Sequence, residues 1–498
     1  MLIDFRPHAR LRGSHPVDVG SVISPVIGAL ARDLADLGRV RIVCDWVQYR
    51  ENFRDIVEVR PVMSGPAGPP AFDLEIAVDV RRSGGAALAD LTSARLPRPP
   101  GQPPGPAAGG AGPPGEAVYL ENWGPGRQSC IWDFNALYWS ALQLWEKVTG
   151  RGYEQALPGG ESDARNREAA RELIGGLFTL WDPLASSGAL PEELYVAELG
   201  VGNGSQARVF LDEFRELDAA RGRGYYRRLH YLMCDYSPYV LDLAREAVAG
   251  HASHVSSVSL DATRPGTSLG FLRGKAFLLY ISNVYDNLPT DEIAQLGGRP
   301  YDVHTRAYFP PEAAADLAAS VSARPEELPR LVRKLLLLGP AVLADAAPGH
   351  ISDPGAAVRF WQQAWSALRL EERYVPLSGL DLYPLAPSVS GEMLRPLLES
   401  GADVRMHVSN GALSSFADSL LLLHPLGRLV CHDLFVTGVE GYRAGFRGPG
   451  KYDGSVVNWV NGPLLAHLGR RRGFEVTYAP FRHRSGGNIV TMTAQARD

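Results

Sequence analysis

The stretch Val196-Ala-Glu-Leu-Gly-Val-Gly-Asn-Gly204 decides the fold that we expect for this chain. It begins with apolar residues typical of a buried strand, and the residues after it fit an amphipathic helix. Glu198 is followed by glycines at every second position, namely Gly200, Gly202 and Gly204. Because glycine lacks a Cβ, its backbone can turn sharply and approach a ligand closely. We interpret the stretch as a ligand-binding turn between strand and helix, the alternative being a glycine-rich turn that binds nothing.

The spacing of these glycines does not fit the dinucleotide fingerprint. That pattern is G-x-G-x-x-G, with an acidic residue roughly 20 positions further on. Counted from Gly200, the third glycine would fall at Ser205, and the next acid at a strand end is Asp235. The spacing therefore favours a nucleoside that carries an amino acid over one that carries a pyrophosphate.

The composition narrows the class of protein. A chain of 498 residues is long enough for two or three domains, and its net charge of −5 comes without a basic run that would indicate nucleic-acid binding. The four cysteines are widely scattered, and no motif has metal-ligand spacing, so we expect no metal and a reducing, cytoplasmic location. No apolar stretch is long enough to span a membrane, so we expect no membrane partner.

Residues 94–117 are almost entirely Pro, Gly and Ala, which predicts a linker. It would separate an N-terminal α+β unit of unknown role, residues 1–93, from the rest of the chain. Residues 118–190 predict a helical lead-in, and the aromatic residues within it suit either a hydrophobic core or the lining of a ligand site. In the N-terminal unit we expect a helix around 21–37 and strands over Arg39–Trp46 and Phe72–Val80.

From residue 191, predicted strands and helices alternate, which indicates a doubly wound, mostly parallel α/β sheet of seven strands. The alternation is interrupted by residues 288–404, which we expect to form a mainly helical cap inserted between strands four and five. The sheet would therefore come from 191–287 and 405–498, the last two strands forming a hairpin. The predicted strands are Tyr195–Leu199, Leu229–Cys234, His254–Leu260, Lys275–Ile281, Arg428–Val436, Phe474–Tyr478 and Asn488–Ala494, and the predicted helices are Ser205–Leu217, Pro238–Val248, Leu413–Leu423 and Pro463–Arg472.

Polar side chains follow each of the first five predicted strands. In an open α/β sheet, ligands bind outside the carboxyl ends of the strands, so we expect these side chains to meet at one edge. Asp235 suits the two hydroxyls of a ribose and Asp261 suits an adenine amino group, while each also suits the N-cap of a helix. The candidates, in chain order, are Glu198 with the three glycines, Asp235 and Ser237, Asp261 and Ala262, Ser282, Asn283, Tyr285 and Asp286, and His432 with Asp433.

The glycine loop and these strand ends resemble class I S-adenosylmethionine (SAM)-dependent methyltransferases, whose loop reads E-x-G-x-G-x-G. Within that superfamily, AELGVGNGS, CDYSPYVLDLAR, SNVYDNLP and the long insertion resemble the MidA-type family. That family includes the mitochondrial protein-arginine methyltransferase of complex I assembly. The resemblance covers roughly residues 194–498 and implies SAM as the cofactor. It would be bound by Glu198, Gly200, Gly202, Gly204, Asp235, Ser237, Asp261, Ala262, Ser282 and Asn283.

The motif SNVYDNLP follows the fourth strand, where the transferred methyl group should emerge. We expect Asn283 and Asp286 to orient the acceptor, with Asp286 also able to take a proton, and Tyr285 to wall the methyl group. Alternatively, Asp286 and the residues after it form an ordinary turn. His432 suits a base near neutral pH or a buried structural histidine.

We therefore expect a SAM-dependent methyltransferase that acts on nitrogen or oxygen of a small molecule or peptide, with a homodimer left open. A protein-arginine acceptor is the alternative. A guanidinium acceptor needs an acidic pocket. Val284 stands where MidA-type members have an acid, which weakens the alternative of a protein-arginine acceptor. Two further alternatives remain: a non-catalytic assembly factor with the same fold, and an enzyme that catalyses another reaction of SAM.

Overall fold

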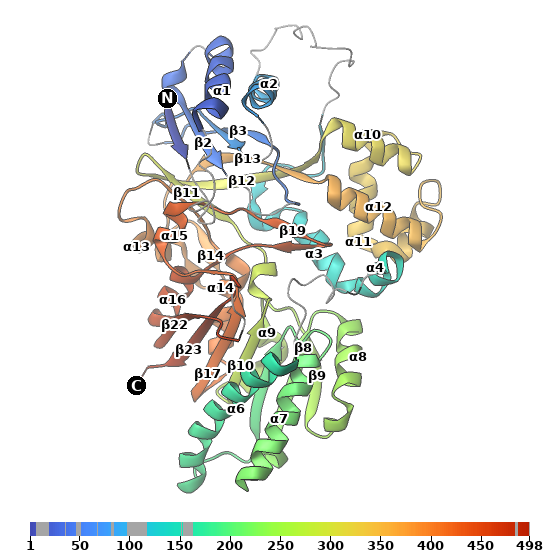
Figure 1. Cartoon of the computed structure of the whole chain (residues 1–498), viewed down its shortest axis with the longest axis vertical. Helices are drawn as coiled ribbons and strands as arrows, with labels where there is room; N and C mark the ends of the chain where they lie inside the picture. The colour runs from blue at the N-terminus through green and yellow to red at the C-terminus, as the bar shows by residue number, and fades with distance from the viewer. Residues whose placement is uncertain are drawn as a thin grey trace.

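The computed structural model describes residues 1–5, 19–34, 36–45, 51–66, 68–80, 84–96, 117–150, 152, 163–483 and 487–497. The predicted linker over 94–117 lies outside these ranges except at its two ends. Two larger assemblies are visible in Figure 1: a sheet with flanking helices in the lower half, and a second set of strands and helices above it.

The lower assembly is a seven-stranded sheet with the strand order β22-β23-β17-β10-β7-β8-β9. Its neighbouring strands run parallel, except that β23 is antiparallel to both β17 and β22. This confirms the prediction of an α/β chain with a mostly parallel sheet. The strands are β7 (Leu194–Leu199), β8 (Leu229–Asp235), β9 (Val255–Ser259), β10 (Ala276–Ser282), β17 (Leu423–Asp433), β22 (Phe474–Pro480) and β23 (Val490–Ala496).

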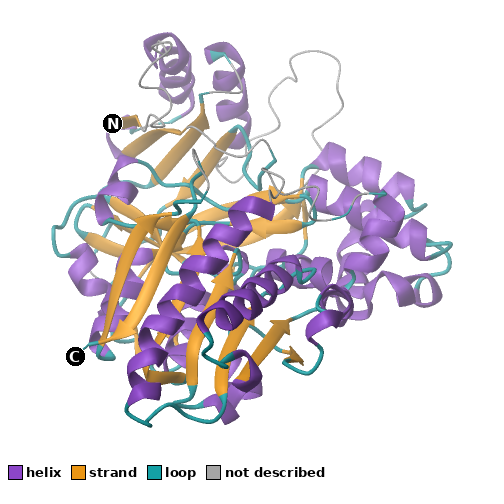
Figure 2. Cartoon of the chain, turned by 60° about the horizontal axis from the view of Figure 1, so that its bottom comes forward, coloured by secondary structure: helices purple, strands orange, loops and turns teal. Residues whose placement is uncertain are grey.

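Helices cover both faces of this sheet (Figure 2). Side chains alternate along a strand, so β10 sends Leu278 and Tyr280 into one hydrophobic core and Leu279 and Ile281 into the other. Such a strand is buried on both sides and therefore reads as a continuous apolar run. The helices of the first core are α6 (Asp163–Ser186), α7 (Ser205–Arg221) and α8 (Pro238–Ala247), and those of the second are α9 (Pro265–Leu269), α14 (Asn410–Leu420) and α16 (Gly462–Arg471).

The chain between β10 and β17 is not only helical, as the sequence led us to expect, but also contains an antiparallel sheet. Its strands are β11 (Glu292–Leu296), β12 (Arg299–Phe309), β13 (Arg369–Pro376) and β16 (Val404–His407), and β12 also pairs with β5 (Val118–Tyr119) and β6 (Gly124–Pro125) of the lead-in. We missed these strands because buried charged residues such as Glu372 and Arg405 interrupt their apolar pattern.

The helical part of this chain packs on the lead-in. A shared hydrophobic core contains Trp361 and Trp365 of the insertion together with Phe134 and Trp145 of the lead-in. One helix, α11, is kinked at Gly339, whose φ is 75°. The helices of this core are α3 (Ile131–Ser140), α4 (Leu142–Thr149), α10 (Pro311–Ser320), α11 (Leu328–Ala346) and α12 (Pro354–Ala367). The short helix α13 (Arg395–Leu398) instead contributes Leu398 to a core of the seven-stranded sheet.

Shorter elements complete the chain after the insertion's third strand. These are β14 (Pro384–Ala386), β15 (Val389–Ser390), β18 (Phe435–Val436), α15 (Val439–Ala444), β19 (Gly450–Tyr452), β20 (Ser455–Val457) and β21 (Val460–Asn461). The β19–β20 hairpin is fixed by Lys451, whose buried ammonium donates to the carbonyl oxygens of Trp365, Ser366 and Leu368 at 2.5, 3.1 and 2.7 Å. These oxygens lie at the C-terminal end of α12, and burial lowers the pKa of Lys451 well below its usual range.

The N-terminal unit is an α+β layer with the strand order β1-β2-β4-β3. Its elements are β1 (Leu2–Phe5), α1 (Val19–Asp33), β2 (Val40–Asp45), β3 (Val57–Pro61), β4 (Leu74–Asp79) and α2 (Gly85–Arg95). The chain leaving β3 lies beside the insertion's β13, with Val62 bridged to Tyr374. The unit therefore adjoins the insertion's sheet.

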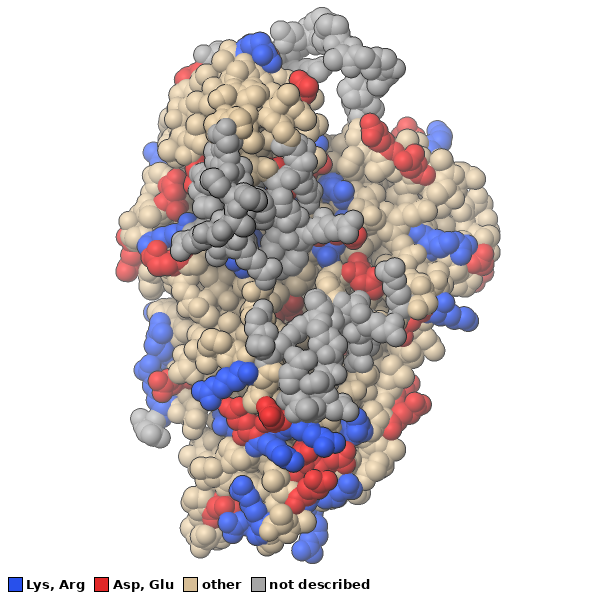
Figure 3. Space-filling view, in the orientation of Figure 1, with Lys and Arg blue, Asp and Glu red and all other residues tan. Residues whose placement is uncertain are grey.

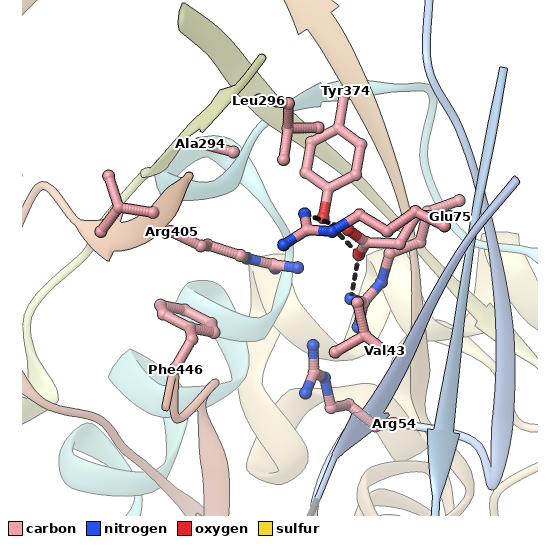
Figure 4. A pocket seen from close by; sticks show the side chains of 11 residues that line it. Val43, Arg54, Glu75, Ala294, Leu296, Tyr374, Arg405 and Phe446 are labelled. Carbon is pink, nitrogen blue, oxygen red and sulfur yellow. Dashed lines mark hydrogen bonds and ion pairs between the residues drawn. The ribbon is translucent and has the colours of Figure 1, made fainter. Parts of the chain in front are cut away.

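A cluster of buried ion pairs joins the N-terminal unit to the insertion, and we call it the ionic cluster. It surrounds a small cavity toward which Arg54 and Arg405 point, while Tyr374 and Glu75 are joined by a hydrogen bond (Figure 4). Its buried members are four arginines, Arg41, Arg54, Arg60 and Arg405, and four glutamates, Glu58, Glu75, Glu292 and Glu372. The partly exposed Asp4 and Asp403 also pair with Arg41.

Charged side chains of both signs share the lower surface in Figure 3, where Figure 1 places α6 and α7. Several belong to ion pairs between or within these helices, such as Arg171 with Glu213 at 2.6 Å. Among the described residues, no helix combines the length and the apolar character that crossing a bilayer requires. In the same part of the chain, no three His, Cys, Asp or Glu side chains gather as metal ligands would.

Candidate functional site

The loop after β7 turns through three glycines in the left-handed region, with φ of 79°, 57° and 81° at Gly200, Gly202 and Gly204. The N–H of Gly200 donates to the carbonyl of Cys234 at 2.8 Å, which ties the loop to β8. A Cβ at Gly204 would lie 2.7 Å from the Cα of Ala244 on α8. Both conformation and close approach therefore require glycine here.

Asp235 ends β8 and lies beside the glycine loop. Its Oδ2 accepts a hydrogen bond from the N–H of Gly202 at 3.3 Å, and its Oδ1 accepts one from the N–H of Ser237 at 3.0 Å. Burial raises the pKa of Asp235 to about 6. From the sequence we expected the loop after strand one and the acid after strand two to meet at one edge of the sheet. In the structure Asp235 lies beside the glycine loop.

Glu198 lies under the loop and is 2 % exposed. Its Oε2 accepts a hydrogen bond of 2.6 Å from the hydroxyl of Tyr231. Burial raises the pKa of Glu198 to about 8, the hydrogen bond from Tyr231 opposes the rise, and the nearby Asp235 adds to it. Within the described ranges, no Lys or Arg forms an ion pair with Glu198 or Asp235, so this pair of acids is suited to receive a positively charged group.

The loop after β10 touches the glycine loop. Asn283 is exposed, adopts a φ of 51°, and donates its N–H to the carbonyl of His432 at 2.9 Å. Val284 packs so closely on Gly200 that a Cβ there would lie 2.3 Å from Cγ2 of Val284. The valine that departs from the MidA-type pattern is therefore in contact with the loop after strand one.

Tyr285 and Asp286, by contrast, are buried, with 2 % and 6 % of their surface exposed. They belong to the short 3₁₀ helix η7 (Tyr285–Asn287). The carboxyl group of Asp286 accepts a hydrogen bond from Nδ2 of Asn287 at 2.8 Å and contacts the carboxylate of Asp433. The structure thus places both predicted catalytic side chains inside the protein and not on its surface.

The remaining cofactor candidates occupy different environments. Ser237 is fully buried and is the N-cap of α8, where its hydroxyl accepts the N–H of Val240 at 3.4 Å. Asp261 is exposed, and its Oδ1 accepts the N–H and the hydroxyl of Thr263, both at 2.8 Å. Ala262 is partly buried against the core, and Ser282 is half-buried at the end of β10.

His432 is paired with the last strand. Its Nδ1 lies 2.9 Å from the hydroxyl of Thr491, and its ring packs against Tyr280 and Phe481. Burial lowers the pKa of His432 to about 4, with His483 adding to the effect, so the ring is neutral at physiological pH. This environment corresponds to the structural histidine of the two alternatives.

Two residues of the site, Asn135 and Tyr231, were missed by sequence reasoning, and the role of a third, Asp433, was not predicted. Asn135 of α3 donates to the carbonyl of Asn287 at 2.9 Å and accepts the N–H of Val456 at 2.9 Å, so the lead-in is bonded to the loop after β10. Tyr231 lies within the predicted strand Leu229–Cys234, where it was read as part of the strand and not of the site. Asp433 had been noted only as a strand-end acid, although its carboxylate accepts three N–H groups of that loop.

Comparisons with known proteins were made at the levels of family, sequence and structure. No protein-family model matches the chain, and no curated protein sequence matches it. Among solved structures, it resembles an uncharacterized COG1565 superfamily protein from Burkholderia thailandensis with 13 % identity and a TM-score of 0.39, over 75 % of this chain and 87 % of that one. A COG1565 superfamily structure from the same organism, with bound S-adenosyl-homocysteine, gives 14 % identity, a TM-score of 0.39, and coverage of 75 % and 88 %. The 1,6-didemethyltoxoflavin-N1-methyltransferase of B. thailandensis gives 10 % identity, a TM-score of 0.30, and coverage of 72 % and 89 %.

Proposed function

We propose that this chain is a SAM-dependent methyltransferase. The observation that carries the proposal is the convergence of the loop after β7 with Asp235: three glycines at positive φ, and the N–H of Gly202 hydrogen-bonded to the Asp235 carboxylate at 3.3 Å. A glycine backbone of this kind lets a ligand approach closely beside an acid, which suits a nucleoside with an amino-acid tail. The edge on which they lie is the one where open α/β sheets bind ligands.

The side chains present fit such a cofactor. Asp235 has carboxylate oxygens able to accept hydrogen bonds from the two ribose hydroxyls. Glu198, buried and without an ion pair to Lys or Arg among the described residues, would bind the ammonium group through its carboxylate. When bound, SAM supplies an electrophilic methyl group on a sulfonium. The remaining task of the protein is to orient the acceptor and to exclude water from it.

The acceptor in this proposal is a nitrogen or oxygen nucleophile of a small molecule or peptide. The loop after β10 would face it, through the exposed side chain of Asn283. Val284 supports this choice over a protein arginine, because its apolar side chain packs on Gly200 at the position where MidA-type members have an acid. The insertion and the lead-in, which share a hydrophobic core and are bonded to the loop through Asn135, would enclose the acceptor.

Calorimetric titration with SAM and with S-adenosylhomocysteine (SAH) tests the proposal. We expect both to bind the wild-type chain, and Gly202→Val to abolish binding without lowering the melting temperature by more than a few degrees. Asp235→Ala should lose more affinity than Asp261→Ala, because Asp235 is half-buried and bonded to the glycine loop, whereas Asp261 is exposed. Absence of binding to the wild-type chain would overturn the proposal and leave the non-catalytic assembly factor.

A second measurement addresses the reaction. SAH released on incubation with SAM and fractionated extract, followed by mass spectrometry of the substrate fraction, should reveal a product heavier by one methylene unit. Release of SAH without such a product would assign the chain to another reaction of SAM.

A further inference from the structure

Asp433 organises the loop that follows β10, although it belongs to β17. The side chain is fully buried, and its Oδ2 accepts hydrogen bonds from the N–H groups of Val284, Tyr285 and Asp286 at 3.1, 2.8 and 3.4 Å. Its Oδ1 accepts the N–H of Leu434 at 2.7 Å. Four backbone donors thus converge on one carboxylate, which is the arrangement that stabilises a buried negative charge.

The carboxyl group of Asp286 faces this carboxylate. Two neighbouring buried carboxylates cannot both be ionised, so one of them holds a proton. Burial, followed by the charge of Asp433, raises the pKa of Asp286 well above its usual range, whereas burial raises that of Asp433 only to about 6, because the backbone N–H groups oppose the rise. Because four N–H groups stabilise the ionised form of Asp433, we place the proton of the pair on Asp286, whose carboxyl group then donates to Asp433.

The titratable neighbours of this carboxyl pair on its own two elements are uncharged. Burial raises the pKa of both Cys431 and Tyr285, the titratable neighbours on β17 and η7, so that each stays protonated. From α14, Ser415 and Ser419 face the Tyr285 hydroxyl, and α3 contributes the amide of Asn135 to the adjacent carbonyl of Asn287. Within the described part of the chain, no Lys or Arg forms an ion pair with Asp286 or Asp433, so the proton shared by the two carboxyl groups reduces their charge.

The loop held in this way is in contact with the glycine loop. The N–H of Val284 is bonded to Asp433, and the side chain of Val284 packs on Gly200. A change at Asp433 would therefore be transmitted through one residue to the backbone proposed to bind the cofactor.

We propose that Asp433 is a positioning residue of the cofactor site, which holds the loop at 283–286 against the glycine loop, and that Asp286 serves it as a neutral hydrogen-bond donor and not as a base. This inference rests on the proposed function. It makes Asp433, at the end of β17, a positioning residue. It also makes Asp286, after β10, a hydrogen-bond donor, where the sequence had predicted a catalytic group.

The first experiment compares full-length variants by SAH calorimetry and by hydrogen exchange of the amides at 284–286. Asp433→Asn places an N–H among the backbone donors, so we expect about a tenfold loss of SAH affinity and faster exchange of these amides. Asp218→Asn is the matched control, because Asp218 is also buried and accepts two backbone N–H groups, from Tyr225 and Tyr226 at 2.9 and 3.0 Å. It should lower the melting temperature and leave SAH affinity unchanged.

The second experiment separates a donor from a base at position 286. Asp286→Asn keeps a donor for Asp433, whereas Asp286→Leu removes it, so the asparagine variant should retain most of the SAH affinity and amide protection that the leucine variant loses. Equal losses in the two variants would overturn the donor role, and an unchanged SAH affinity in folded Asp433→Asn would overturn the positioning role. If the wild-type chain bound no SAH, the proposed function would fall with the inference about the cofactor site, while exchange at 284–286 would still report whether Asp433 holds the loop.

Discussion

The hydroxyl of Tyr231 on β8 donates a hydrogen bond of 2.6 Å to Oε2 of Glu198 on the neighbouring β7. Both side chains are 2 % exposed, so the acid that precedes the glycine loop is held in place from within the sheet. The ionic cluster offers a contrast, since each of its glutamates is paired with an arginine. Among the described residues, the acid at the loop accepts a hydrogen bond from a neutral donor and pairs with no Lys or Arg, so its protonation is sensitive to what binds there.

Glu198→Gln should make the protein more resistant to high pH. The pKa of Glu198 is raised from 4.5 to about 8 in the folded chain, so the folded state binds more protons than the unfolded state between these values, and its stability falls as pH rises through this window. Removing the titration should raise the free energy of unfolding at pH 8.5 by a few kcal/mol, on the order of 2–4, and by much less at pH 4.5.

Urea unfolding at pH 4.5, 7 and 8.5 measures this difference. Asp261→Asn, a change to an exposed acid of the same sheet edge, is the control and should keep the wild-type dependence on pH. If the free energy of unfolding of Glu198→Gln depended on pH as that of the wild type does, the pKa of Glu198 would not be raised in the folded chain.

Binding of a cationic ligand at this acid should release a proton. An ammonium group favours the ionised form of Glu198, so its pKa falls in the complex, and SAM affinity should rise with pH between about 6 and 8. Calorimetry at pH 7 in phosphate and in Tris, which differ in ionisation enthalpy, gives the number of protons released. Release that persists in Glu198→Gln would have to come from another group, Asp235 being the first to examine.

Gly200→Ala should destabilise the protein and Val284→Ala should partly rescue it. The added Cβ would lie 2.3 Å from Cγ2 of Val284 at a φ of 79°, so we expect a loss of about 2–4 kcal/mol, from the overlap and from the backbone strain together. Removing the valine methyls relieves the overlap but not the strain, which should leave the double variant about 1–2 kcal/mol below the Val284→Ala background. Thermal unfolding of the four proteins in this cycle measures the coupling, and additive losses would contradict the contact.

Glu372→Gln should disrupt the ionic cluster and loosen the N-terminal unit. Glu372 of β13 contacts Arg405 of the insertion at 2.7 Å and Arg60 of the N-terminal unit at 2.8 Å, with every partner buried. Loss of one member leaves a guanidinium charge uncompensated, which destabilises by about 3–5 kcal/mol. Protection of the N-terminal strands against hydrogen exchange should fall together with the melting temperature.

The matched control is Glu392→Gln, which removes the partner of an exposed Arg395 at 2.6 Å. A surface pair of this kind contributes about 1 kcal/mol or less. Similar effects of the two substitutions would indicate that the cluster is solvated and that the N-terminal unit docks by other contacts.

Local patterns in the sequence were enough to predict the strands of the seven-stranded sheet and the loop at its edge. The apolar run at Ala276–Ser282 indicates a strand that is buried on both faces. The glycines at 200, 202 and 204 indicate a backbone with positive φ. The strands of the insertion were missed because their buried residues include charges, and a charge is buried only where a partner from elsewhere neutralises it. Arg405 and its partner Glu292 are 113 positions apart, and no window of sequence contains both.

In the candidate site, too, some features could be predicted from the sequence and others depended on the tertiary structure. The glycine loop, Asp235 and the acid at Glu198 followed from residue type and spacing, because the end of a strand in an open α/β sheet has a known place. The burial of Asp286, Tyr285 and His432 could not be predicted from the sequence, because it depends on the residues that pack over them in the folded chain. Asp433, 147 positions along the chain from Asp286, supplies the carboxylate that holds the loop and, by its charge, keeps its neighbour protonated. The sequence by itself determined which backbone could approach a ligand, and only the tertiary structure decided which acids are free to act, since the protonation of a carboxyl group depends on the charges and donors that folding brings within a few ångströms of it.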